Sequence, residues 1–116
     1  MKLIKGMQYA ILQVEINEIN IMNLKALRTK CKKDILEIAA MCSTESIKIF
    51  GSVVRGENGK DSDIDFLVHM KPNTGFSIGG IGWRLEKLLG RKVDVVPDTS
   101  LHWSLKDQIL KEAVAL

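Results

Sequence analysis

Two aspartates downstream of a glycine–serine pair are the residues of this sequence whose types and spacing best suit chemistry. Gly51 and Ser52 are followed, after ten intervening residues, by Asp63 and Asp65. Side chains alternate between faces along a β-strand, so Asp63 and Asp65 are expected to share one face. Two carboxylates together with the phosphates of a nucleotide provide the oxygen ligands that Mg²⁺ prefers. The segment therefore predicts a site for divalent metal and a nucleoside triphosphate, and indicates nucleotidyl transfer.

A third carboxylate, Asp94, lies in the middle of the apolar run 92–96. A charge at the centre of such a strand costs free energy unless it is paired or bound to metal. An ion pair with Arg91 or Lys92 is one solution. A site shared with the earlier aspartate pair is the other, because three carboxylates can hold two Mg²⁺ ions and accept the proton of an attacking hydroxyl. We favour the shared site.

Gly51, Ser52 and Arg55 are candidates for holding phosphates. Glycine lets the backbone approach a phosphate closely, and amides at the start of a helical turn attract anions. The Ser52 hydroxyl adds a donor, and the guanidinium of Arg55, one turn later, offers a fork of donors. Two plainer interpretations stay open. Gly51 and Ser52 can form an ordinary strand-to-helix turn, and Arg55 can pair on the surface with Glu57 or Asp61.

Hydrophobic periodicity predicts the elements that position these residues. Steps of three and four residues predict an amphipathic helix of about five turns; its inward residues are Leu24, Leu27, Cys31, Ile35, Ile38 and Cys42. A strand at 47–50 stops at Gly51 and leads into a helical turn at 52–56. The second strand is predicted at 63–70, and the third at 92–96, cut by Pro97.

Two further helices are expected in the C-terminal half. Ser77 is expected to cap a helix that ends at Gly90, with these residues inward: Ile78, Ile81, Leu85, Leu88 and Leu89. Thr99 or Ser100 is expected to cap the last helix, with these residues inward: Leu101, Leu105, Ile109, Leu110 and Ala113.

The composition is that of one soluble globular domain. The chain has 116 residues, of which 46% are hydrophobic and 27% charged, and its net charge of +3 does not by itself argue for nucleic acid. No apolar run is long enough to span a membrane, and no signal peptide is evident, so a cytoplasmic protein is expected. Residues 1–21 are expected to be an extension that precedes a domain over residues 22–116. A short edge strand in that segment is the alternative.

The cysteines, histidines and tryptophans are expected to be structural. Cys31 and Cys42 lie eleven residues apart on the first helix, about 16 Å along its axis, so they cannot form a disulfide with each other and are expected to be reduced and buried. His69 and His102 lack metal-ligand spacing and are expected to be structural or exposed. Core or rim positions are expected for both tryptophans, and an exposed pair that docks a partner is the alternative; they are Trp83 and Trp103.

Four segments together resemble the minimal nucleotidyltransferases of the DNA polymerase β superfamily. They are 51–56, 61–68, 88–96 and the closing 110–114. The resemblance covers about residues 22–116. Its specific features are the ten-residue gap before the paired aspartates and the third aspartate on the next strand. A lone Asp-x-Asp would be weak evidence.

The resemblance implies an α/β (α+β) fold, a small mixed β-sheet with helices packed on one side and the nucleotide at the strand ends. It implies that the catalytic, metal-binding residues are Asp63, Asp65 and Asp94. It also implies that the residues holding the phosphates of ATP are Gly51, Ser52 and Arg55.

Members of this family are often antitoxins paired with HEPN-domain ribonuclease toxins. The resemblance implies that the chain uses Mg²⁺, as two ions, to transfer AMP from ATP to a tyrosine of such a toxin. The main alternative is an antitoxin that neutralises the toxin by binding alone. Modification of a small molecule is less favoured because related enzymes need an additional helical domain. Transfer to RNA is less favoured because no basic and aromatic strand face is visible.

Overall fold

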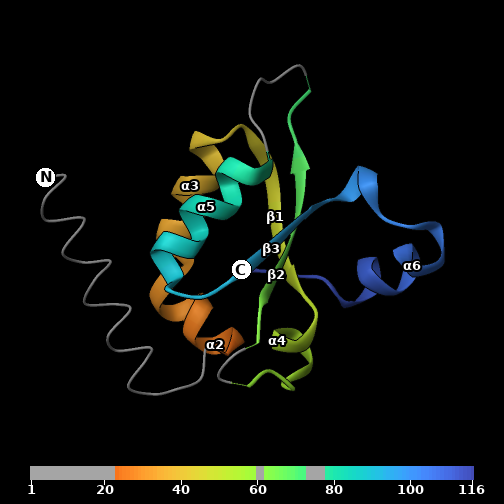
Figure 1. Ribbon diagram of the computed structural model, residues 1–116, viewed down its shortest axis with the longest axis horizontal. Coiled ribbons are helices and arrows are strands. Elements are labelled where there is room, and N and C mark those ends of the chain that lie inside the picture. Colours follow the sequence, from red (N-terminus) through yellow and green to blue (C-terminus); the bar gives the residue numbers. More distant parts are fainter. Residues whose placement is uncertain (1–22, 60–61, 73–77) are drawn as a thin grey trace, which may run out of the picture.

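The computed structural model describes residues 23–59, 62–72 and 78–116 of the chain. The predicted extension over residues 1–21 and the predicted cap Ser77 lie outside the described residues. Figure 1 shows a sheet with helices α2, α3 and α5 on one side and helix α6 on the other. Among the described residues, no helix is long and apolar enough to cross a membrane.

The sheet has four strands in the order β3-β2-β1-β4. Their bounds are β1, Thr44–Phe50; β2, Ile64–Met70; β3, Val93–Pro97; and β4, Val114–Ala115. Strand β1 runs antiparallel to both β2 and β4, whereas β2 and β3 are parallel. The predicted small mixed sheet is therefore confirmed, and the parallel pair is the one that carries the aspartates.

The first predicted helix is confirmed as one continuous run of helical turns. It consists of α2 (Leu24–Ala26), the π-helical turn η1 (Leu27–Cys31) and α3 (Lys32–Met41). The Asn23 side chain caps its start by accepting a hydrogen bond from the Ala26 amide at 2.8 Å. All the predicted inward residues except the half-buried Leu24 are buried. Both cysteines are free and buried, as expected.

Helix α5 (Ile78–Leu89) packs beside α3 against the same face of the sheet. Of the five residues that the periodicity placed inward, Ile78 is only partly buried, and the other four are buried: Ile81, Leu85, Leu88 and Leu89. Strand residues of alternating positions complete this core, among them Ile49, Phe66 and Val68. Burial of these apolar side chains is the main stabilising contribution, so a single core holds the two central strands in place.

The strand bounds differ from the predicted ones at several points, and β2 and β3 each start one residue later than predicted, at Ile64 and Val93. Strand β1 begins at Thr44 rather than Ile47, because Thr44 is buried and its hydroxyl contacts the Met70 sulfur at 3.6 Å. Pro97 is the last residue of β3 rather than a break. Proline is tolerated there because β3 is an edge strand. Strand β4, only two residues long, was not predicted.

The last helix, α6 (Trp103–Glu112), differs most from its prediction. It starts at Trp103, and its cap is His102, whose ring accepts from the Ser104 amide at 3.2 Å. Thr99 and Ser100 instead belong to the short 3₁₀ turn η2 (Asp98–Ser100). The predicted caps were therefore wrong.

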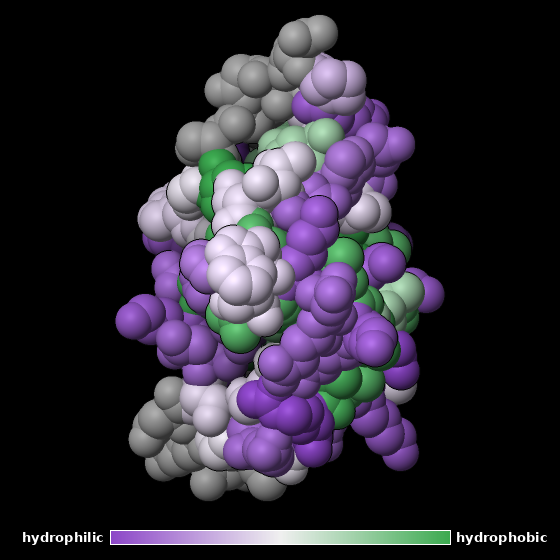
Figure 2. Space-filling model, turned by 90° about the vertical axis from the view of Figure 1, so that its right-hand side faces the viewer, coloured by the Kyte–Doolittle hydropathy of each residue, from purple (hydrophilic) through white to green (hydrophobic). Residues whose placement is uncertain are grey.

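The predicted inward face of α6 was wrong as well. No residue of α6 is buried, and Leu105 and Leu110 are 50% and 45% exposed. The reason is that α6 lies on the side of the sheet opposite to the core. Figure 2 shows that side with hydrophobic patches among hydrophilic side chains.

Both tryptophans are exposed rather than packed in the core or at its rim. Trp83 is 58% exposed and Trp103 is 83% exposed. The Lys87 ammonium lies 4.8 Å from the ring centre of Trp83, and the ring of Trp103 stacks on that of His102. The histidines fit their expectation: His102 caps α6, and His69 is half-exposed and pairs with Asp98 and Glu45.

Candidate active site

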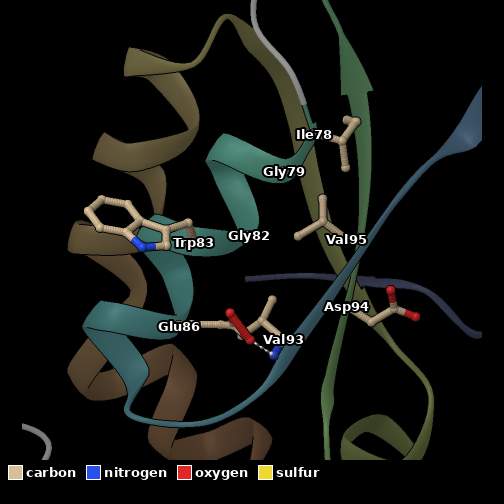
Figure 3. Close-up of a pocket in the computed structure, with 8 residues that line it drawn as sticks. All are labelled: Ile78, Gly79, Gly82, Trp83, Glu86, Val93, Asp94 and Val95. Carbon is tan, nitrogen blue, oxygen red and sulfur yellow. Dashed lines mark hydrogen bonds between the residues drawn. The ribbon is translucent and has the colours of Figure 1, made fainter.

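Asp65 and Asp94 are brought together by the register of two parallel strands. Asp65 on β2 is the direct partner of Asp94 on β3. Ile64 and Phe66, which flank Asp65, are buried in the core, and Val93 and Val95, which flank Asp94, pack against it. The two aspartates therefore point to the opposite face of the sheet. Figure 3 shows the Asp94 carboxylate on the side of β3 that faces away from α5. The exposed position explains how a charge is tolerated in the middle of an apolar strand.

Asp63 lies one residue before the start of β2 and is half-buried. The carboxylates interact electrostatically, as the pKa of Asp65 shows. Partial burial, and then the charges of Asp94, Asp63 and Glu112, raise the pKa of Asp65 from 3.8 to about 6, against an opposing effect of Arg55. The local excess of negative charge is a feature that a bound cation would relieve.

The described residues contain no group of three His, Cys, Asp or Glu side chains placed to hold a metal ion. The site formed by Asp63, Asp65 and Asp94 therefore stays a prediction. A site for Mg²⁺ needs less, because this ion keeps several waters and is commonly held by one or two carboxylates plus substrate phosphates. The in-register pair of Asp65 and Asp94 fits that requirement by its oxygen donors and its charge.

Gly51 lies directly against the Asp65 carboxylate. Its φ of +81° falls in the region that favours glycine. A Cβ atom built on Gly51 would lie 2.2 Å from Asp65 Oδ2, which is closer than any non-bonded contact allows. Gly51 is thus needed both for the backbone turn and to leave space for the carboxylate. Gly51, which was predicted to let the backbone approach a phosphate, therefore lies beside Asp65, a predicted metal ligand.

A single helical turn, α4, follows the glycine and carries the other predicted phosphate-binding residues. It spans Ser52–Arg55 and ends at Gly56, which has a φ of +70°. The amides of Val54 and Arg55 donate to the Gly51 carbonyl at 3.0 and 3.2 Å. The predicted strand-to-helix turn is confirmed, and it places Ser52 and Arg55 next to Gly51.

Arg55 forms ion pairs with two glutamates. One is the pair with Glu57 that the sequence allowed, and the other is with Glu112 at the end of α6. A second oxygen of Glu112 accepts from the Gly51 amide at 3.2 Å. The Glu112 side chain is only 14% exposed. Sequence reasoning missed Glu112, although it lies in the closing segment 110–114 of the family resemblance.

A groove of about 450 Å³ lies between α5 and β3. It is lined by Ile78, Gly79, Gly82, Trp83, Glu86, Val93, Asp94 and Val95. The Glu86 carboxylate accepts from the Val93 amide at 3.1 Å and so ties α5 to β3 beside Asp94 (Figure 3). The groove lies behind the face that carries the paired aspartates.

A mixed sheet with an in-register aspartate pair is the arrangement that the sequence motifs predicted, and comparison with known families identifies the class of protein. The family model described as the nucleotidyltransferase domain matches residues 24–116. This chain belongs to the nucleotidyltransferase domain family, as the sequence motifs predicted.

Curated relatives are matched over nearly their full length. A protein of Methanocaldococcus jannaschii, provisionally named a protein adenylyltransferase, is 38% identical over 84 residues, which is 72% of this chain and 90% of that protein. The protein adenylyltransferase MntA of Thermococcus cleftensis is 34% identical over 92 residues, 78% of this chain and 90% of that protein.

Solved structures support the fold. A structure provisionally described as a minimal nucleotidyltransferase has a TM-score of 0.68 and 36% identity, and the match covers 82% of this chain and 97% of that one. A toxin–antitoxin crystal structure with AMP-PNP has a TM-score of 0.63 and 22% identity, covering 73% and 71% of the two chains. The second likeness shows the fold alone.

Proposed function

We propose that this protein is a Mg²⁺-dependent protein adenylyltransferase that acts as an antitoxin. It transfers AMP from ATP to a tyrosine hydroxyl of a partner toxin with a HEPN domain. The observation that carries the proposal is the in-register pair of Asp65 and Asp94 beside Gly51. Support for the donor and acceptor comes from the relatives named as protein adenylyltransferases. Support for the partner comes from the structural neighbour titled as a toxin–antitoxin.

Each site residue has a role in this mechanism. Asp65 and Asp94, with Asp63 beside them, would hold Mg²⁺, which when bound neutralises the phosphates and orients them. The Gly51 amide, the Ser52 hydroxyl and the Arg55 guanidinium bind phosphate oxygens. Positioning and charge neutralisation supply most of the rate acceleration, since phosphoryl transfer asks for little covalent chemistry from the protein.

The chemical step is a substitution at the α-phosphorus of ATP. The acceptor hydroxyl oxygen forms a bond to the α-phosphorus while its proton passes to a carboxylate, to which we assign Asp94. The bond between the α-phosphorus and the bridging oxygen breaks, and pyrophosphate leaves. Asp94 suits the role of base because it is exposed on the open face, where an acceptor side chain can approach.

The decisive experiment mixes the protein, Mg²⁺, ATP labelled at the α-phosphate and a purified HEPN-domain protein encoded by the gene next to its own. Label is expected on the toxin with the wild-type protein and not with the double variant Asp63→Asn/Asp65→Asn. Circular dichroism of the double variant provides the control for folding. Equal labelling by the double variant, or no labelling by either protein, contradicts the proposal.

An antitoxin that acts by binding alone remains the alternative. It predicts that the double variant still blocks the toxin, in a one-to-one ratio and without ATP. Toxin activity is therefore measured in the same samples. Catalytic action predicts that substoichiometric wild-type protein silences the toxin, because each molecule can modify many toxin molecules.

A further inference from the structure

One carboxylate engages two of the groups that the proposed function assigns to nucleotide phosphates. Glu112 Oε2 accepts from the Gly51 amide at 3.2 Å, and Oε1 accepts from Arg55 Nη1. The Glu112 side chain is mostly buried, whereas that of Arg55 is 47% exposed. Glu112 thus lies on the inner side of Arg55, against the glycine turn.

A carboxylate and a phosphate bind the same kinds of hydrogen-bond donor. Both are oxyanions that accept hydrogen bonds from backbone amides and from the fork of a guanidinium. A nucleotide phosphate that binds the Gly51 amide and the Arg55 guanidinium would therefore compete with the Glu112 carboxylate, which already accepts hydrogen bonds from both groups. Glu57 also pairs with Arg55, and Asp65 lies against Gly51, so the surroundings repel a further anion until a carboxylate leaves.

The helix that carries Glu112 is suited to movement. Glu112 is the last residue of α6, and the other residues of this helix are exposed or, in the case of Ile109, only partly buried. Strand β4 begins after a single intervening residue, Ala113, and has contacts of its own that do not involve Glu112. It pairs with β1 at Lys48 and Ile49, and the Arg28 guanidinium donates to the Ala115 carbonyl at 2.6 and 3.1 Å. Glu112 can therefore withdraw from Gly51 while β4 stays in the sheet.

We propose that Glu112 holds the place of a nucleotide phosphate, and that nucleotide binding displaces Glu112 and loosens α6. The inference rests on the proposed function, because it takes Gly51 and Arg55 as phosphate-binding groups. It makes the C-terminal helix responsive to the nucleotide. Since α6 displays Trp103 and Leu110 on its surface, nucleotide binding would change an exposed apolar surface some distance from the aspartates.

The affinity test compares Glu112→Gln and Glu112→Ala with the wild type by calorimetric titration with Mg²⁺ and a non-hydrolysable ATP analogue. Loss of the competing charge is expected to lower the Kd by about tenfold. Asp107→Asn is the matched control, because it makes the same change of carboxylate to amide on an exposed part of the same helix, and its Kd should equal that of the wild type.

Weaker binding by the Glu112 variants would show that Glu112 instead supports Arg55 in a binding orientation, and would overturn the inference. Unchanged binding would overturn it as well. Binding of the analogue by none of the four proteins would refute the proposed function itself, and this inference with it. The two failures are thus distinguishable.

The second measurement uses the wild-type protein alone, so it does not depend on whether a variant folds. Hydrogen exchange of the amides over residues 106–112 is followed with Mg²⁺, with and without the analogue. Displacement of Glu112 predicts at least severalfold faster exchange in α6 when the analogue is bound, while exchange in β1 and β2 does not accelerate. Unchanged or slower exchange in α6 with the analogue bound would contradict the proposal.

Discussion

At the scale of single residues, the contact between Gly51 and Asp65 is the most demanding feature of the site. Gly51→Ala should cost about 2 kcal/mol of stability, because the new Cβ would meet Asp65 Oδ2 and the φ is positive. AMP transfer should be lost as the carboxylate is pushed aside. Urea denaturation and the labelling assay measure the two effects.

Gly82→Ala is the control for that substitution. A Cβ on Gly82 would meet the Val95 side chain at 3.6 Å, an ordinary contact, and Gly82 lies within a helix. We therefore expect unchanged or higher stability, by up to about 1 kcal/mol. If Gly51→Ala and Gly82→Ala behave alike, the steric role of Gly51 is wrong.

The raised pKa of Asp65 predicts a pH dependence of stability in the absence of metal. The folded pKa, about 6, lies above the ordinary 3.8, so the folded state binds the proton more tightly than the unfolded state does. The contribution of Asp65 to the free energy of unfolding is fully present below pH 3.8 and is lost as the pH rises through about 6. Urea denaturation in EDTA at pH 4 and pH 7 should show a loss on the order of 1 kcal/mol in the wild type relative to Asp65→Asn, allowing for solvent screening.

Mg²⁺ provides the check on this prediction. Because a ligand that binds only the folded state stabilises it, millimolar Mg²⁺ should stabilise the wild type more at pH 7 than at pH 5, where Asp65 is largely protonated. Parallel stability curves for the wild type and Asp65→Asn at all pH values, with and without Mg²⁺, would contradict the assignment of Asp65.

The candidate site could be predicted from sequence as far as its residues are local or lie on regular strands. The strands that carry Asp65 and Asp94 follow from the local sequence pattern. Asp63 was predicted to be the first residue of the second strand, but it lies one residue before β2. Glu112 could not be found in this way, because its partner Gly51 lies 61 residues away in the sequence. The hydrophobic periodicity of a helix predicts which of its residues share a face. It does not predict which backbone amide, distant in the sequence, a side chain on that face will contact.

At the scale of elements, α6 and α5 should respond very differently to mutation. Trp103 is 83% exposed and Leu85 is fully buried in the core. Trp103→Ser should change the free energy of unfolding by less than about 0.5 kcal/mol, whereas Leu85→Ala should cost about 2–5 kcal/mol through lost burial and a residual cavity. Denaturant titrations measure both. A large loss of stability in Trp103→Ser would indicate that α6 is part of the core.

Helix α6 also shows why its environment escaped prediction. The spacing of Leu105 and Ile109 correctly indicated a helix. The same spacing is found in helices whose apolar face packs on a core and in helices whose apolar face is exposed. Helix α5 has the same kind of pattern but lies on the side where α3 already forms a layer. Whether a face is covered depends on the arrangement of layers, which local periodicity does not contain.

At the scale of the whole molecule, the two buried cysteines report on global unfolding. Cys31 and Cys42 are 0% and 1% exposed, and burial, followed by the charge of Asp34, raises the pKa of Cys31 to about 11. Because the thiolate is the reactive form, both thiols should react with a disulfide reagent only when the core opens. The reaction rate should rise steeply with urea.

The control is Lys33→Cys, which places a thiol on an exposed position of the same helix. This added thiol should react within seconds in the native protein while the original two stay protected. Rapid modification of all three thiols without denaturant would mean that α3 does not pack as described.

The hydrogen bond between Glu86 and the Val93 amide affects how readily two molecules of this protein can associate through the edges of their sheets. Strand β3 is an edge of the sheet, and an open edge can pair with a strand of another molecule. The Ile64 amide donates to the Lys92 carbonyl, so by alternation the backbone groups of Val93 point outward. There Glu86 already occupies the amide, and Pro97 offers none. Two of the outward positions of β3 therefore offer no free amide to a strand of another molecule, which disfavours self-association through the strand that carries Asp94.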